Sequence, residues 1–257
     1  MTSSTQQPQP KSHVRLSPGA PLPLGLFITG TGTEVGKTHV AALIAKRLVS
    51  DGVRVGVYKP AASGCRREGG VLLSDDALEL WQAAGRPESL ELVCPQRFEA
   101  PLAPPVAAHL ENRRVDPELL RAGAAAWRGR CDVLLVEGAG GLMSPLSDDD
   151  YNADLAIDLG YPLVVVAANR LGVINDTLQT VITASVIDSL RPGRELRVAG
   201  VVLNDATPAA DQSRSTNAEE LRRRLGPPLL ACVAWQGGLD REVDWGRLAR
   251  DRPPAAG

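Results

Sequence analysis

The sequence of 257 residues lacks the features that mark most extracellular and membrane proteins. Its four cysteines, Cys65, Cys94, Cys131 and Cys232, are widely spaced and form no C-x-x-C pair, as a zinc ribbon or a compact disulfide framework would require. A reduced chain in the cytoplasm is therefore expected. No apolar run of about 18 residues is present, so no membrane-spanning helix is expected either.

The chain also has little net charge and few aromatic side chains. Lys plus Arg number 28 against 30 Asp plus Glu, a formal net charge of −2, and aromatic residues make up 4%. Domains that bind nucleic acid through a broad basic face are usually strongly basic, and those that stack single strands need more rings. A polybasic membrane anchor is absent as well. We therefore expect neither nucleic acid nor a membrane as a partner.

Both ends of the chain lack the apolar content of a folded domain. Residues 1–21 are rich in Ser, Gln and Pro, without the apolar centre of a signal peptide, so export is not expected. They are predicted to form a disordered tail, because too few apolar groups are present to offset the entropy of ordering. Residues 251–257 are expected to fray. No Gly/Ser linker divides residues 22–250, whose length suits a single domain.

Short apolar runs that alternate with helical patterns fill this domain. Strands are predicted at Leu22–Thr29, Val53–Tyr58, Val133–Val136, Leu163–Ala168 and Val198–Leu203. Helices are predicted at Lys37–Ser50, Asp75–Ala84, Pro117–Trp127 and Ile174–Leu190. Such alternation indicates βαβ units, a parallel sheet and an α/β fold.

The strongest motif joins the first predicted strand to the first predicted helix. Residues Gly30–Thr38 read G-T-G-T-E-V-G-K-T, one residue longer than the standard G-x-x-x-x-G-K-[ST] loop. Backbone N–H groups in such a loop bind phosphates, Lys37 can reach the β- and γ-phosphates, and the Thr38 hydroxyl can bind Mg²⁺. A Gly-rich turn without a ligand is the alternative, which the Gly-Lys-Thr ending disfavours. We predict a P-loop NTPase-like three-layer fold, with a mostly parallel central sheet flanked by helices.

Charged residues follow two other predicted strands. Ligands of open parallel sheets bind beyond the carboxyl ends of the strands, so Lys59 would face the same crevice as Lys37. A surface lysine near a turn is the alternative for Lys59. Glu137 would hold Mg²⁺ directly or through water. The glycines that follow it, Gly138, Gly140 and Gly141, would let a ligand approach the backbone closely.

Three further segments are less informative. Ser74-Asp75-Asp76 is read as a helix cap rather than a ligand set. Asp148–Asp150 is expected to be a solvated loop. Asn204-Asp205 could read a base edge or make an ordinary turn. A G-x-S-x-G elbow is absent, which argues against a Ser-His-Asp hydrolase.

Taken together, these segments resemble the dethiobiotin synthetase family, ATP-dependent enzymes that close the ureido ring in biotin synthesis. The resemblance is carried, between about Leu24 and Trp235, by Gly30–Thr38, Tyr58–Gly64, Asp76–Leu78, Val136–Gly141, Ser144–Asp148, Leu171–Asn175 and Asn204-Asp205. It implies ATP and Mg²⁺ as cofactors, with 7,8-diaminopelargonate (7,8-diaminononanoate) and CO₂ as substrates. It also implies a homodimer with the active site at the interface.

The resemblance assigns roles to individual residues. The catalytic residues would be Lys37, Lys59 and Ser63. The ligands of Mg²⁺ would be Thr38, Asp76 and Glu137. By this resemblance Asp76 is a metal ligand rather than part of a helix cap. The nucleotide would contact Thr33, Glu34, Val35, Gly36, Lys37, Thr38, Glu137, Gly138, Ala139, Gly140, Asn204, Asp205, Ala234, Trp235 and Gln236. The diamine would contact Thr33, Lys37, Lys59, Ser63, Gly172, Val173 and Asn175, the last three at a helix start where N–H groups favour its carboxylate.

Two departures and two alternatives accompany the resemblance. Pro105 stands where the family often has His, and Ala234 replaces a common Pro. A related amide-forming ligase is one alternative, but such enzymes usually carry a glutaminase domain, for which this chain offers no room. A ParA/MinD-like ATPase switch is the other. Those switches carry an additional lysine early in the loop, and residues 31–34 contain none.

Overall fold

The computed structural model describes residues 21–190, 196–208 and 211–251. The predicted tail therefore lies outside the described residues, apart from Pro21. Of the C-terminal stretch that is expected to fray, only Asp251 is described. Its backbone carbonyl accepts a hydrogen bond from Arg197 at 2.6 Å, and its carboxylate pairs with the same guanidinium at 3.3 Å. Asp251 is thus held against the domain.

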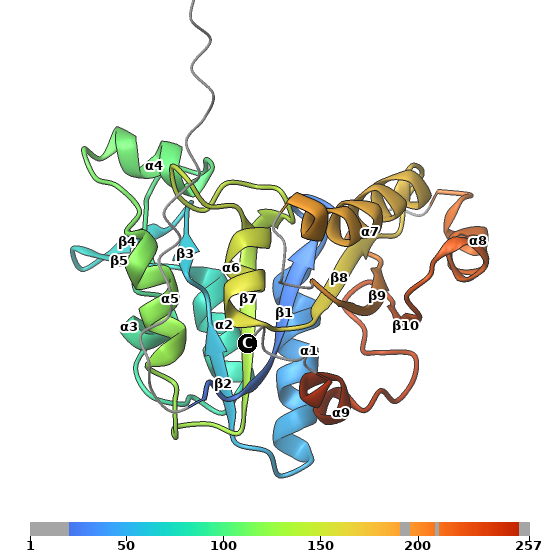
Figure 1. The fold of residues 1–257 in the computed structure, drawn as a ribbon, viewed down its shortest axis with the longest axis horizontal. Helices are drawn as coiled ribbons and strands as arrows, with labels where there is room; N and C mark the ends of the chain where they lie inside the picture. The colour runs from blue at the N-terminus through green and yellow to red at the C-terminus, as the bar shows by residue number, and fades with distance from the viewer. Residues whose placement is uncertain (1–20, 191–195, 209–210, 252–257) are drawn as a thin grey trace, which may run out of the picture.

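A six-stranded sheet forms the centre of the molecule, in the order β10-β9-β8-β1-β7-β2 (Figure 1). All five neighbouring pairs are parallel, which confirms the predicted fold class. The strands are β1 (Leu24–Gly30), β2 (Val55–Tyr58), β7 (Val133–Gly141), β8 (Leu163–Ala168), β9 (Val198–Asn204) and β10 (Leu229–Val233).

The continuous apolar runs of the sequence follow from burial on both faces of this sheet. Every residue of β8 is buried, as are six of the seven in β1. A strand covered on both sides has no solvent face that would favour alternating polar residues. The predicted strand at 133–136 continues in the structure to Gly141, because the glycine-rich segment keeps pairing with β1.

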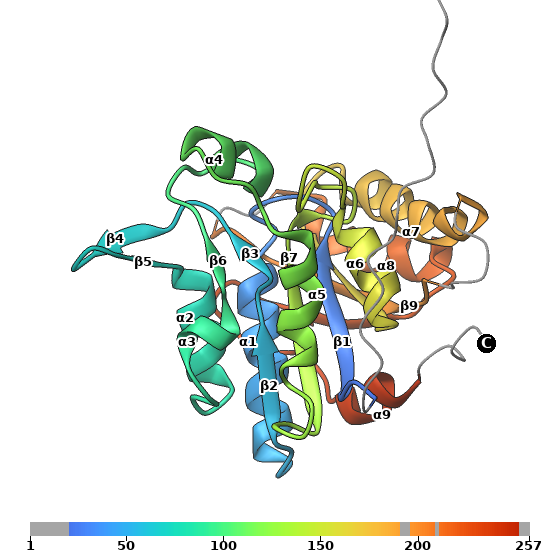
Figure 2. The same cartoon turned by 60° about the vertical axis from the view of Figure 1, so that its left-hand side comes forward.

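Helices cover both faces of the sheet. On one face α1 packs against α2 and α9, and on the other α5 packs against α6, and α7 against α8 (Figures 1 and 2). Their bounds are α1 (Lys37–Ser50), α2 (Asp75–Ala83), α5 (Pro117–Ala125), α6 (Asn152–Leu159), α7 (Val173–Leu190), α8 (Arg214–Arg224) and α9 (Trp245–Arg250). Among the described residues, no helix has the length and apolar character needed to cross a membrane.

An insertion between β2 and α5 forms one wall of the site described below. It contains the short parallel pair β3 (Ala61–Ala62) and β6 (Gln96–Arg97) and the hairpin β4 (Arg66–Glu68) and β5 (Val71–Leu73). It also contains α3 (Leu90–Val93) and α4 (Pro104–Leu110). Figure 2 shows α4 above the carboxyl ends of the strands, with the hairpin projecting to the side.

Candidate active site

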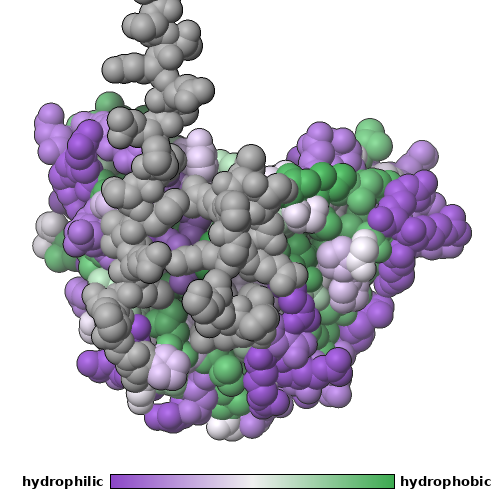
Figure 3. Space-filling view, in the orientation of Figure 1, coloured by the Kyte–Doolittle hydropathy of each residue, from purple (hydrophilic) through white to green (hydrophobic). Residues whose placement is uncertain are grey.

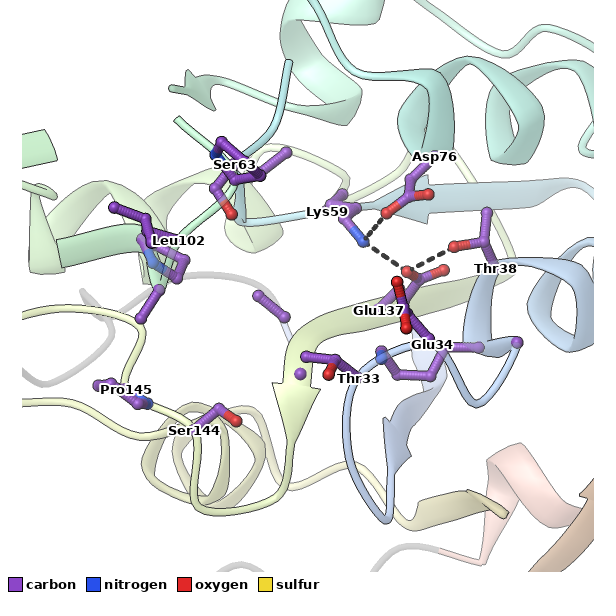
Figure 4. Close-up of a pocket in the computed structure, with 18 residues that line it drawn as sticks. Thr33, Glu34, Thr38, Lys59, Ser63, Asp76, Leu102, Glu137, Ser144 and Pro145 are labelled. Carbon is purple, nitrogen blue, oxygen red and sulfur yellow. Dashed lines mark hydrogen bonds and ion pairs between the residues drawn. The ribbon is translucent and has the colours of Figure 1, made fainter. Parts of the chain in front are cut away.

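A cavity of about 640 Å³ opens at the carboxyl ends of β1, β2 and β7. Figure 4 shows Ser63 and Leu102 on one side of it, Ser144 and Pro145 on another, and a cluster of charged side chains at its end. The lining residues are Thr33, Glu34, Gly36, Lys37, Thr38, Lys59, Ala62, Ser63, Asp76, Pro101, Leu102, Ala103, Pro104, Glu137, Ala139, Gly140, Ser144 and Pro145.

The phosphate-binding loop lies between β1 and α1, as predicted. Its last residue, Gly36, has φ +83°, and a Cβ there would lie 2.1 Å from the Asn204 amide nitrogen, so only glycine fits. Lys37 is buried, and its ammonium donates to the Gly32 carbonyl at 3.2 Å. Burial lowers the pKa of Lys37, which the nearby Glu137 carboxylate partly opposes. The lysine therefore lies folded over the loop, where a phosphate would sit.

The centre of the charged cluster is the ammonium group of Lys59. It lies 2.7 Å from the Asp76 carboxylate and 2.5 Å from that of Glu137, while the Thr38 hydroxyl donates to the same Glu137 oxygen at 3.0 Å (Figure 4). Lys59 and Glu137 are 4% and 1% exposed. The alternative of a surface lysine is therefore wrong.

Lys59 and Asp76 keep their charges at neutral pH. Burial lowers the pKa of Lys59, but the carboxylates of Glu137 and Asp76 outweigh it, so this pKa lies above the ordinary value. Burial likewise raises the pKa of Asp76, and the attraction of Lys59 outweighs it and brings that pKa below the ordinary value. The ammonium of Lys59 and the carboxylate of Asp76 therefore form a stable ion pair.

The oxygens around Glu137 fit a magnesium ion. One hydroxyl and two carboxylates, from Thr38, Asp76 and Glu137, form the donor set that Mg²⁺ prefers. The second carboxylate oxygen of Glu137 is buried and has no hydrogen-bond partner among the described residues. Asp76 also follows Ser74, whose hydroxyl accepts from the Ala77 amide and caps α2. The capping segment thus brings Asp76 to the cavity.

The glycine-rich end of β7 turns under the cavity. Ala139 and Gly140 line the cavity, but Gly138 does not. A Cβ at Gly138 would lie 2.4 Å from the Asn152 side-chain oxygen, so this glycine makes room for a neighbouring side chain. Gly140 has φ +75°. Of the segment predicted to let a ligand approach closely, Ala139 and Gly140 therefore face this cavity, and Gly138 does not.

The residues predicted to hold adenine lie beyond the P-loop, at the ends of β9 and β10. The Asn204 amide donates to the Val35 carbonyl at 3.0 Å, and its own oxygen is buried without a partner among the described residues. Asp205 accepts from Asn169 at 2.8 Å. Ala234, Trp235 and Gln236 follow β10 in a loop that His39 contacts through the Gly237 carbonyl at 3.1 Å.

The predicted substrate residues at the start of α7 are not brought to this cavity. Gly172, Val173 and Asn175 are absent from its lining, and also from that of a second cavity of about 390 Å³ beside it. The second cavity is bounded by the P-loop, Met143 and later residues of α7. Gly172 and Asn175 lie exposed on the surface.

Two walls of the cavity are formed by residues to which the sequence analysis assigns no role. One is the apolar segment Pro101–Pro104, which leads into α4, and the other is Ser144-Pro145. Pro105 occupies the first turn of α4, where proline is favoured, and is buried. The proline clustering at 101–105 was the available signal for the first wall.

The predicted solvated loop at Asp148–Asp150 is exposed at Asp148 and Asp149, as expected, whereas Asp150 is half-buried. Asp148 pairs with His109 at 3.1 Å and with Arg114 at 3.2 Å. Asp150 pairs with the buried Arg121 at 2.8 Å. Asp148 and Asp150 therefore tie the loop after β7 to α4, to α5 and to the segment between these two helices.

The sheet order, the P-loop and the acidic strand end together define a P-loop nucleotide-binding protein. A family model described as an AAA domain matches residues 24–243. The chain is 46% identical to the ATP-dependent dethiobiotin synthetase BioD of Rhodopirellula baltica, over 82% of this chain and 84% of that protein. The proteins of the same name from Anaeromyxobacter dehalogenans strain 2CP-1 and Thermodesulfovibrio yellowstonii are 42% and 34% identical, over 85% of this chain and 93% and 91% of theirs. The chain belongs to the dethiobiotin synthetase family.

Solved structures add only a distant likeness. The signal recognition particle receptor FtsY of Elizabethkingia anophelis superimposes with a TM-score of 0.49 at 13% identity, over 89% of this chain and 64% of that one. That likeness has no bearing on function.

Proposed function

We propose that this chain is an ATP-dependent cyclo-ligase that makes dethiobiotin from 7,8-diaminopelargonate and CO₂. One observation carries the proposal: on a chain of this family, Lys59 lies buried between Asp76 and Glu137 in the same cavity as the P-loop. Phosphoryl transfer depends mainly on positioning and charge neutralisation, and this cavity brings two lysines and a nest of backbone donors together.

The proposed reaction has three steps. One amine of the diamine adds to CO₂ and loses a proton, which gives a carbamate. A carbamate oxygen then takes the γ-phosphoryl group of ATP, which leaves ADP and a carbamic–phosphoric anhydride. The second amine attacks the carbamate carbon, loses a proton, closes the ureido ring and expels phosphate. Each step moves negative charge within reach of cationic groups, which is what the lysines of the cavity would stabilise.

Residues of the cavity and of the segments beside it would each bind a different part of the substrates. Lys37 and the backbone from Thr33 to Thr38 would hold the phosphates, with Thr33 and Lys37 also near the diamine. Lys59 and Ser63 would contact the carbamate and the transferring phosphoryl group. Glu137, Gly138, Ala139 and Gly140 would complete the nucleotide site on the side of β7, and Asn204, Asp205 and Ala234–Gln236 would hold the adenine.

Mg²⁺ would be held by Thr38, Asp76 and Glu137. When bound, it would neutralise phosphate charge between the nucleotide and these acids. Among the described residues, no group of three or more His, Cys, Asp or Glu gathers. Two carboxylates with a hydroxyl suit an ion that usually takes only one or two protein carboxylates and keeps several waters.

We also propose a homodimer whose sites are completed across the interface. Gly172, Val173 and Asn175 would bind the substrate carboxylate of the partner's site, which explains why they avoid both cavities of their own chain. Apolar side chains gather over α7 in Figure 3. Leu171 and Ile182 are 77% and 58% exposed there. A second copy would cover them. The free cysteines further support a cytoplasmic location.

The test is ADP release by the purified chain. ADP should form only when MgATP, bicarbonate and 7,8-diaminopelargonate are all present, and dethiobiotin should be the product by mass spectrometry. ATP turnover that ignores the diamine and instead rises with a protein partner would favour an ATPase switch. Release of ADP with no dependence on bicarbonate would exclude ring closure by this route.

A further inference from the structure

A buried asparagine at the start of α6 holds the backbone that forms one wall of the cavity. Asn152 is 0% exposed. Its amide nitrogen donates to the carbonyls of Ala139 and Gly141, both at 2.7 Å, and to that of Ser144 at 3.3 Å. Its oxygen accepts from the Ala139 amide at 3.1 Å. One side chain thus joins the end of β7 to the following loop.

Gly138, Gly140 and Ser144 pack closely around the hydrogen bonds of Asn152. A Cβ at Gly138 would lie 2.4 Å from the Asn152 oxygen, and one at Gly140 would lie 2.5 Å from the Ser144 hydroxyl. That hydroxyl accepts from the Gly141 amide at 2.9 Å. In this conformation the polar groups of the turn are paired with one another.

The far end of the loop is anchored independently. Arg121, which is 3% exposed, pairs with Asp150 and with Asp158, and Ser147 donates to Asp150 at 2.8 Å. The loop from residue 142 to 150 is thus fixed at Asn152 and at Arg121. Ala139, Gly140, Ser144 and Pro145 of this region line the cavity.

The geometry points to Asn152 as a positioning residue for the reaction proposed above, on which this inference rests. Asn152 does not line the cavity. It acts by fixing the backbone of Ala139–Ser144 at the distance that the substrates require. A carboxamide suits the task because it offers two donors to carbonyls and one acceptor to an amide. The carboxylate of Asn152→Asp would be repelled by the three carbonyl oxygens. The methyl group of Asn152→Ala would leave these carbonyls without their hydrogen-bond donor.

The test compares Asn152→Asp and Asn152→Ala with the same changes at Gln96. Gln96 is 4% exposed and does not line the cavity, and its amide exchanges two hydrogen bonds with the backbone of Asp116. We expect kcat/KM for the diamine to fall roughly 10–100-fold in the Asn152 variants, the range found when groups that orient ligand-binding residues are lost. KM should rise more than kcat falls. The Gln96 variants should stay near the wild type.

Hydrogen–deuterium exchange supplies a readout that does not need turnover. Exchange in the Asn152 variants should speed up at the amides of Ala139 and Gly141 and stay unchanged in β8 and β9. Equal catalytic losses in the Asn152 and Gln96 variants, or faster exchange spread over the whole sheet, would reduce Asn152 to a merely structural residue. If the wild type shows no diamine-dependent turnover, the proposed function fails, and the exchange pattern still decides whether Asn152 fixes this wall.

Discussion

Lys59 is held in the cavity by two ion pairs. Its ammonium balances two carboxylates, one of them on a side chain 1% exposed. A buried charge is stable only when it is paired, so Lys59 and Glu137 depend on each other. Lys37 differs, because its ammonium contacts a backbone carbonyl and burial lowers its pKa. Lys59 is therefore paired with carboxylates of the protein, whereas Lys37 has no carboxylate within hydrogen-bonding distance among the described residues and can pair with a phosphate.

Replacing Lys59 should separate catalysis from nucleotide binding. In Lys59→Ala, kcat should fall roughly a hundredfold or more, as when one preorganised group that stabilises developing charge is removed. The Kd for ATP should change far less, because Lys37 and the loop amides remain. Single-turnover kinetics and calorimetry measure the two quantities. Lys46→Ala, at an exposed position on α1, is the control. Unchanged turnover in Lys59→Ala would remove Lys59 from the mechanism.

At the scale of elements, buried ion pairs fix the loop after β7 to the helices beside it. The guanidinium of Arg121 lies 2.6 Å from Asp158 on α6 and 2.8 Å from Asp150 in the loop, and it also donates to the Pro117 carbonyl. These contacts join α5 to α6. Removing the cation would leave two largely buried carboxylates without their main counter-ion.

Arg121→Met should therefore destabilise the fold strongly. The expected loss in free energy of unfolding is about 3–5 kcal/mol, the cost of breaking a buried pair by removing one partner. Urea denaturation followed by circular dichroism measures it. Arg54→Met is the matched control, because Arg54 forms an equally short pair with Asp132 but is 63% exposed. A loss at Arg121 no larger than that at Arg54 would contradict the argument.

Sequence patterns predicted the elements whose burial is regular. The helix at 37–50 and the strand at 163–168 have the bounds predicted for them. Helix α6 was not predicted, because nearly all of its residues are buried and no polar face marks a helical period. Strand β10 was not predicted either, since its short run alternates between buried and half-buried positions. Both depend on contacts that only the assembled sheet supplies.

Residues of the site, too, could be predicted only where a local sequence pattern marks them. Lys37, Lys59 and Glu137 were predicted because each directly follows a strand or a loop motif, and the carboxyl ends of parallel strands share one edge. The role of Asn152 could not be predicted, because it depends on carbonyls that a loop brings back to it. Side chains that act on the backbone of distant segments leave no local pattern.

At the scale of the whole molecule, one half of the predicted substrate site lies outside the cavity. Lys59 and Ser63 line the cavity, while Gly172 and Asn175 do not. If two copies pair through α7, the start of this helix can serve the cavity of the partner. The sheet, the cavity and the exposed apolar residues of α7 then belong to one symmetric arrangement, in which each chain supplies part of both sites.

Shared sites predict complementation between two impaired variants. Lys59→Ala removes the cavity lysine, and Asn175→Ala removes one of the proposed contacts to the substrate carboxylate, so each homodimer should turn over far more slowly than the wild type. After subunit exchange, half of the dimers are mixed, and each contains one site with both groups intact. Mixing equal amounts should therefore restore about a quarter of wild-type turnover in a two-fold dimer.

A substitution at the proposed interface tests whether this recovery needs the dimer. Ile182→Glu in both variants should abolish the recovery and halve the molecular mass measured by light scattering. Val71→Glu, at an exposed site on β5, should change neither the recovery nor the mass. Recovery that is absent although mixed dimers form would mean that each chain completes its own site.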